Sequence, residues 1–327
     1  MARIEADIFP GDDPEQTQRV LTAIEAAKQQ GWELFSSAQL SRNAQEWDNH
    51  LKEATQDLPA AWLAKATDAV RFLPLVHRMN GDHLARTLEQ GRIEALAQRG
   101  GVGRTADYEM ALGLGDYAFL SLATWKGAFD NPAPIYYPPG PLLAQEGAVV
   151  TLKDIAHYSH LPFGRRIETY QQTAFHGRDF FRLLPYFLVL HYGDLDNSQD
   201  RDVHNLYPPS IARALGYLNS FHPEIKVKGG LAITDECRIG PPEHGFTSIP
   251  SADRDFIETY YMGRLVPDIE KEIFGKAEQQ LKGEPDFDLF FELNEKLEEL
   301  YHQDGTWISI FVQRGREWWP EHRYYER

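Results

Sequence analysis

A short segment late in the chain alternates between charged and apolar residues. Glu224 and Lys226 fall on one face of an extended strand, while Ile225 and Val227 fall on the other. Pro223 precedes the segment, supplies no backbone donor and keeps the chain extended. The pattern predicts a strand that opens on Glu224. Taken alone, its charged face is typical of a solvated edge strand.

Other apolar runs predict further strands. We expect them at residues 75–77, 117–122, 148–152, 186–191 and 307–312. The run at residues 185–192 is the most apolar in the chain, which favours a central strand. Apolar residues at helical spacing predict helices at residues 12–70, 82–93, 209–215, 253–273 and 287–300, and Gly91 interrupts the second of these.

These elements predict an α+β fold with three regions. Residues 1–73 form a helical N-terminal region, and residues 74–250 form a mixed β core. Residues 251–327 form a helical C-terminal region that includes a terminal strand.

Composition restricts the class of protein. The 327 residues carry a net charge of −16, which argues against binding nucleic acid by bulk electrostatics. No apolar run approaches the ~18 residues that a membrane span needs, so we expect no membrane partner. The N-terminus lacks the apolar core of a secretory signal, and Cys237 is the single cysteine. We therefore expect a cytoplasmic protein, or an effector secreted without a classical signal.

The order of the predicted elements is more informative than any single residue. A strand ending in His77 is followed by a helix up to Gly91, then a strand carrying Ser121, and later the strand that opens on Glu224. Over residues 74–235 this order resembles the ADP-ribosyltransferase superfamily. The run from Glu224 to Val227 matches the Glu-x-x-Val form of the strand that carries that family's catalytic glutamate.

The resemblance implies a split antiparallel β core and a reaction that uses NAD as a substrate. Nicotinamide leaves, and ADP-ribose passes to a macromolecular acceptor, as in a toxin or effector. The superfamily also includes proteins that modify nucleic acid bases, so the acceptor class stays open, and the net charge of −16 favours a protein over a nucleic acid. Glu224 is then the catalytic carboxylate, which offsets positive charge on the ribose. The implied NAD-binding residues are His77, Arg78, Ser121, Tyr117 and Tyr136, and no metal is needed. We expect His77, Ser121 and Glu224 to converge on one cleft.

Two alternatives stay open. The twelve histidines, among them the pair His157 and His160, suggest a metal-dependent hydrolase that also uses Asp194, Asp196 or Asp202 as ligands. The acidic, aromatic-rich composition also fits a non-enzymatic protein that binds or neutralises a partner. Metal analysis separates the first alternative from the transferase, and turnover of NAD separates the second.

Overall fold

A computed structural model describes residues 4, 14–79, 81–99, 107–123, 133–158, 161–196, 221, 223–239 and 306–320. The α-helices are α1 (Pro14–Gln29), α2 (Ser37–Thr55), α3 (Ala60–Ala69), α4 (Gly81–Gln90), α5 (Asp107–Leu112), α6 (Pro139–Leu143), α7 (Phe163–Gln172), α8 (Gly177–Tyr192) and α13 (Thr306–Trp318). The strands are β1 (Leu75–Met79), β2 (Arg92–Ile93), β3 (Tyr117–Leu122), β4 (Ala133–Tyr137), β5 (Ala148–Thr151), β6 (Ala174–His176), β7 (Glu224–Lys228), β8 (Leu231–Ala232) and β9 (Arg238–Ile239).

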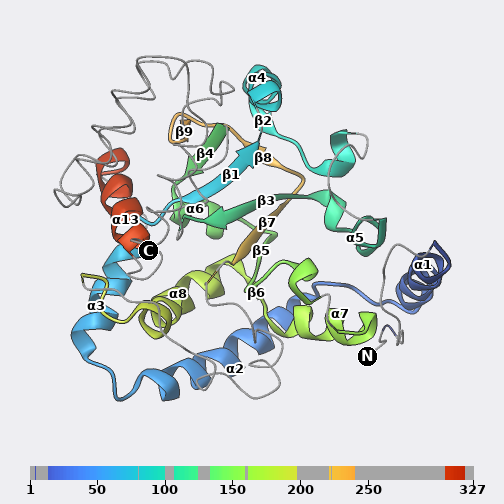
Figure 1. The fold of residues 1–327 in the computed structure, drawn as a ribbon, viewed down its shortest axis with the longest axis horizontal. Helices are drawn as coiled ribbons and strands as arrows, with labels where there is room; N and C mark the ends of the chain where they lie inside the picture. Colours follow the sequence, from blue (N-terminus) through green and yellow to red (C-terminus); the bar gives the residue numbers. More distant parts are fainter. Residues whose placement is uncertain are drawn as a thin grey trace, which may run out of the picture.

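Seven of these strands form one antiparallel sheet in the order β6-β5-β7-β3-β1-β4-β9 (Figure 1). The strands β2 and β8 form a separate pair. The α+β prediction is therefore confirmed for the described part of the chain. The strands predicted around residues 75–77, 117–122, 148–152 and 224–227 are also confirmed, within a residue or two at their ends.

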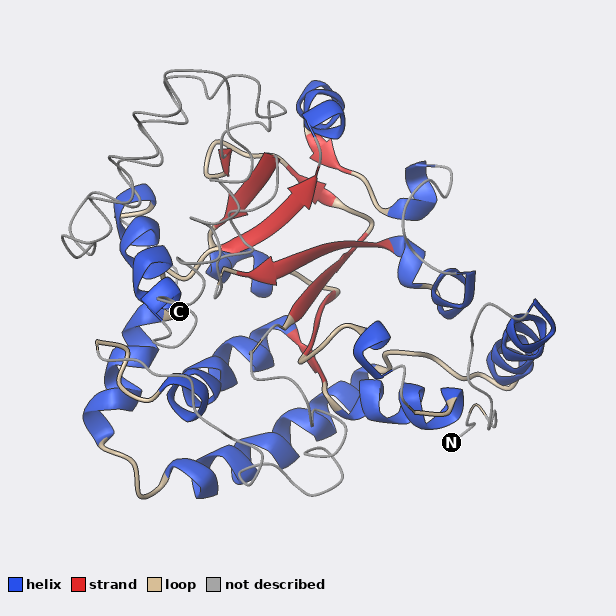
Figure 2. Ribbon diagram, viewed as in Figure 1, coloured by secondary structure: helices blue, strands red, loops and turns tan. Residues whose placement is uncertain are grey.

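The large sheet opens between two of its central strands. β1 and β3 are paired only at Leu75–Leu122 and Val76–Ser121, whereas the β1–β4 and β3–β7 ladders each run over five pairs. Beyond Val76 the two strands diverge, as Figure 2 shows. The sheet is thus divided into a β1-β4-β9 part and a β3-β7-β5-β6 part.

Helices cover both faces of this sheet. The face that carries Ile225 and Val150 shares one hydrophobic core with Leu184 and Phe187 of α8. Trp47 of α2 belongs to the same core, so the N-terminal helices pack directly with the β core. On the other face, Tyr170 of α7 packs over Lys226 of β7, and Phe311 of α13 packs against Tyr136 of β4.

Three predictions about elements are wrong. Residues 186–191 are not a strand but part of α8, which begins upstream at Gly177 and whose last two turns are buried on almost every side. Residues 307–312 lie in the helix α13. The helix predicted at residues 82–93 breaks at Gly91, as predicted, because Gly91 adopts a positive φ of 65°. It does not continue beyond the break, since residue 93 is in β2. The helices predicted at residues 209–215, 253–273 and 287–300 lie outside the described residues.

None of the helices in the described ranges is both long and apolar enough to cross a bilayer.

Candidate functional site

β7 begins next to a buried aromatic anchor. The ring of Phe221 stacks on the rings of Phe187 and His191, with centroids 5.3 and 4.8 Å apart, and its side chain is buried. Pro223 is buried as well. Phe221 packs the chain against α8 just before the strand, so the position of Glu224 is set by packing on its N-terminal side.

The strand that opens on Glu224 is central, not an edge strand. β3 and β5 pair with it on either side, and Glu224 lies directly opposite Ser121 and Thr151. Directly paired residues project to the same face, with Cβ atoms about 4.5–5.5 Å apart. The carboxylate of Glu224 and the hydroxyls of Ser121 and Thr151 therefore share one end of one face.

Lys226 lies two residues farther along the same face and is fully buried. Its Nζ lies 2.5 Å from Oε2 of Glu224 and donates a 2.7 Å hydrogen bond to Oγ1 of Thr151. The ammonium group also faces the rings of Tyr170 and Phe119, at 5.1 and 5.8 Å from their centroids. A buried charge thus has partners on every adjoining element: β7 itself, β3, β5 and α7.

The Glu224 side chain remains partly accessible, with 20% of its surface exposed. Burial raises the pKa of its carboxyl above the ordinary value, the charge of Lys226 opposes this, and the charge of Asp154 adds to it. Tyr170 is buried on the α7 side, and its pKa is raised by burial and by the charge of Glu224. The group that meets a ligand here is therefore a carboxylate whose ionisation depends on its neighbours.

His77 does not join Glu224 and Ser121. Val76 is paired with Ser121, and Ser121 is paired with Glu224, so these three residues share a face. Successive residues of a strand project to opposite faces, which places His77 on the other one. The prediction that His77, Ser121 and Glu224 converge on one cleft is wrong, although their three strands are adjacent in the sheet.

His77 instead lies where β1 and β3 separate. The amide of Ala123 donates to the carbonyl of Pro74, so odd-numbered residues of β3 direct their backbone groups toward β1. The carbonyl of Phe119 therefore points into the widening gap, and Nδ1 of His77 donates a 2.6 Å hydrogen bond to it. Because a carbonyl only accepts, Nδ1 carries a proton.

A small cavity of about 100 Å³ adjoins His77 on that face. Its lining includes Thr87 and Gln90 of α4, and also Glu94 and Arg99 from the segment around β2. These side chains offer hydrogen-bond donors and acceptors as well as charges of both signs. The cavity is therefore polar on the side that faces α4.

The remaining predicted NAD-binding residues lie elsewhere. Tyr117 is opposite Lys228, four residues along β3 from Ser121, or about 13 Å at the rise of a strand. Tyr136 is buried among Phe311 and Trp318 of α13, so it belongs to the core. Arg78 is on β1, but its side chain is outside the described part of the structure.

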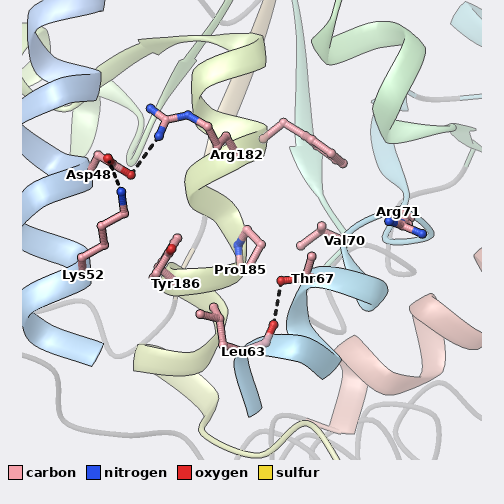
Figure 3. A pocket seen from close by; sticks show the side chains of 10 residues that line it. Asp48, Lys52, Leu63, Thr67, Val70, Arg71, Arg182, Pro185 and Tyr186 are labelled. Atoms are coloured by element: carbon pink, nitrogen blue, oxygen red, sulfur yellow. Dashed lines mark hydrogen bonds and ion pairs between the residues drawn. The ribbon is translucent and has the colours of Figure 1, made fainter. Parts of the chain in front are cut away.

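A larger cavity, of about 440 Å³, lies between α2, α3 and α8 (Figure 3). Its charged groups pair with one another: Asp48 binds Lys52 and Arg182, each at 2.8 Å. None of the predicted site residues lines this cavity, and we assign it no chemistry.

Among the described residues, no group of three or more His, Cys, Asp or Glu side chains is arranged to hold an ion. The side chain of His157, together with His160 and Asp202 of the metal-site alternative, lies outside the described part of the structure. His191, one of the histidines behind that alternative, stacks on Phe221 inside the core. No protein-family model matches the chain, and no curated protein matches its sequence.

Of the residues around Glu224, Ser121 is among the predicted site residues, whereas Lys226, Thr151 and Tyr170 are not. Lys226 is part of the alternating pattern, but an edge strand would leave its charge solvated. Thr151 and Tyr170 lie more than fifty residues from Glu224 in the sequence, and no local pattern connects them with it.

Proposed function

We propose that this protein is an NAD-dependent ADP-ribosyltransferase and that Glu224 is its catalytic carboxylate. One observation carries the proposal: β7, β3 and β1 are consecutive strands of the antiparallel sheet. They bring Glu224, Ser121 and His77 into neighbouring strands, although more than a hundred residues separate β3 from β7. This agrees with the element order on which the family resemblance rests.

The chemistry needs a carboxylate at an accessible position. When nicotinamide leaves NAD, the C1 atom of its ribose develops the positive charge of an oxocarbenium ion. A carboxylate beside that ribose offsets the charge and accepts hydrogen bonds from the hydroxyls. Glu224 supplies this carboxylate at a partly exposed position, where a ligand can reach it. The hydroxyl side chain of Ser121 lies directly opposite it on β3.

The proposed role of His77 is to bind the adenosine side of NAD. Nδ1 of its imidazole donates to the Phe119 carbonyl, which holds the ring at the edge of a cavity of about 100 Å³. Thr87, Gln90, Glu94 and Arg99 give that cavity polar groups that can hydrogen-bond a ribose. His77 and Glu224 project from opposite faces of the sheet. A single NAD molecule that contacts both must therefore extend from one face to the other through the opening between β1 and β3.

The proposed acceptor is a macromolecule, and a protein rather than a nucleic acid. A net charge of −16 disfavours a polyanionic acceptor, because phosphates are bound through clustered Lys and Arg.

The proposal is tested by incubating the purified full chain with NAD and measuring free nicotinamide. Release that persists after chelation of metal ions, together with transfer of labelled ADP-ribose to added protein, is the expected result. Binding of NAD without release would favour the non-enzymatic alternative. Loss of activity on chelation would favour the metal-dependent hydrolase.

A further inference from the structure

The contacts of Lys226 are unusual for a lysine. Long charged side chains normally keep the ammonium group in water, and full burial is rare unless the charge is paired. Lys226 has no exposed surface and lies in the middle of a central strand. Its charge is accommodated by the carboxylate of Glu224, the hydroxyl of Thr151 and the ring faces of Tyr170 and Phe119.

This arrangement is asymmetric in a way that matters for chemistry. Lys226 is wholly enclosed, whereas one fifth of the Glu224 side chain is exposed. Only the carboxylate of the pair is therefore accessible to a ligand, and the ammonium group of Lys226 contacts it from the buried side. The hydrogen bond to Thr151 fixes the ammonium group on β5, so Lys226 holds the carboxylate from a rigid position.

We propose that Lys226 is a positioning residue that keeps Glu224 ionised and orients its carboxylate. The catalytic consequence rests on the proposed function, but the ion pair itself does not. Without the lysine, the charged carboxylate would lie in a half-buried site with the charge of Asp154 nearby and without the cation that lowers its pKa. The buried Tyr170 and the hydroxyls of Thr151 and Ser121 offer hydrogen bonding but no positive charge.

The direction of the pH effect follows from these groups. Burial and Asp154 both raise the pKa of the Glu224 carboxyl, and Lys226 lowers it. Removing Lys226 leaves the two raising effects unopposed, so the carboxyl stays protonated to a higher pH. The acid limb of kcat/KM should move to higher pH by about one unit or more, which is a loss of about tenfold on that limb. KM should change less than kcat, because the lysine does not reach the ligand.

The test compares Lys226→Met with Lys228→Met. Lys228 is a matched control, since it lies on the same strand and the same face but is exposed. Nicotinamide release is measured as a function of pH. The carboxyl of Glu224 is titrated in parallel by carbon-13 NMR of glutamate-labelled protein, its signal being assigned by its absence in Glu224→Gln. We expect both profiles to shift in Lys226→Met and neither to shift in Lys228→Met.

Two further variants keep the test decisive if Lys226→Met folds poorly. Thr151→Val removes one anchor of the ammonium group and should produce a smaller shift in the same direction. Glu224→Gln combined with Lys226→Met replaces the ion pair with a neutral pair and should fold better than Lys226→Met alone.

The outcomes separate this inference from the proposed function. Unchanged titration of Glu224 and an unchanged pH profile in Lys226→Met would overturn the inference, even in an active enzyme. If the wild-type protein releases no nicotinamide but the NMR titration still shifts, the ion pair stands and the proposed function fails.

Discussion

Lys153 is a buried amine whose replacement should stabilise the protein. Its side chain is only 3% exposed, and burial lowers its pKa from 10.5 to about 7. The folded protein therefore releases this proton at a lower pH than the unfolded chain does. Lys153→Met keeps a long apolar side chain but removes the amine, so it isolates the free energy of placing that charge in the interior.

The magnitude follows from the pKa difference. About 3.5 pH units at ~1.4 kcal/mol per unit correspond to roughly 5 kcal/mol, an upper bound on what the charged amine costs the folded state. Lys153 also makes interactions that methionine loses. We therefore expect Lys153→Met to raise the free energy of unfolding by about 2–4 kcal/mol at pH 6.

The sign of the pH dependence is fixed by linkage. Between pH 7 and 10.5 the unfolded chain holds a proton that the folded protein has released, so this residue makes the wild-type protein more stable as pH rises. Below pH 7 the cost is fully present. The advantage of Lys153→Met over wild type should therefore be largest at pH 6 and shrink toward pH 10.

Urea unfolding of both proteins at pH 6, 8 and 9.5 measures this difference. Lys228→Met, an exposed lysine, is the control and should give no pH-dependent difference. If Lys153→Met were less stable than wild type by the same amount at every pH, the amine would be held in its charged form by a partner. The reasoning from burial would then be refuted.

Two other predictions concern NAD binding and the turn after β7. His77→Ala should raise KM for NAD several-fold with little change in kcat, because the imidazole is proposed to bind the ligand equally in the ground and transition states. Initial rates measured over a range of NAD concentrations test this, and an unchanged KM would contradict it. Gly230→Ala should lower the free energy of unfolding by more than ~2 kcal/mol, because its φ is 92° and a Cβ there would meet the carbonyl of Ile93. Gly31→Ala is the matched control for urea unfolding, since φ is 79° but the space is open, and its cost should be only about 1–2 kcal/mol. Equal costs at both glycines would contradict the steric argument.

The sequence predicted elements well wherever one face of a strand differs from the other. β7 alternates between charged and apolar residues, and its start at Glu224 was predicted correctly. α8 was missed because its last two turns are buried on nearly all sides, which removes the helical periodicity. A short apolar run of that kind is equally consistent with a buried strand.

The candidate site was predictable only in part, because strand order and strand register are different kinds of information. The sequence order indicated which strands carry Glu224, Ser121 and His77. It did not specify the register of the strands, in which Ser121 pairs with Val76 and not with His77. Because Val76 and His77 are adjacent residues of one strand, His77 projects to the opposite face of the sheet. The burial of Lys226 likewise depends on β5 and α7, which no local pattern connects with β7.

The central claim is that Glu224 is a catalytic carboxylate, and a paired measurement on Glu224→Gln tests it most directly. Nicotinamide release from NAD and the affinity for NAD are measured for wild type, for Glu224→Gln and for the exposed control Glu146→Gln, with thermal melts to verify folding. The variant keeps shape and hydrogen-bonding capacity but lacks the charge. We predict that Glu224→Gln loses ~10²–10³-fold in kcat with little change in NAD affinity, and that Glu146→Gln matches wild type. A folded Glu224→Gln protein that releases nicotinamide at the wild-type rate would contradict the claim.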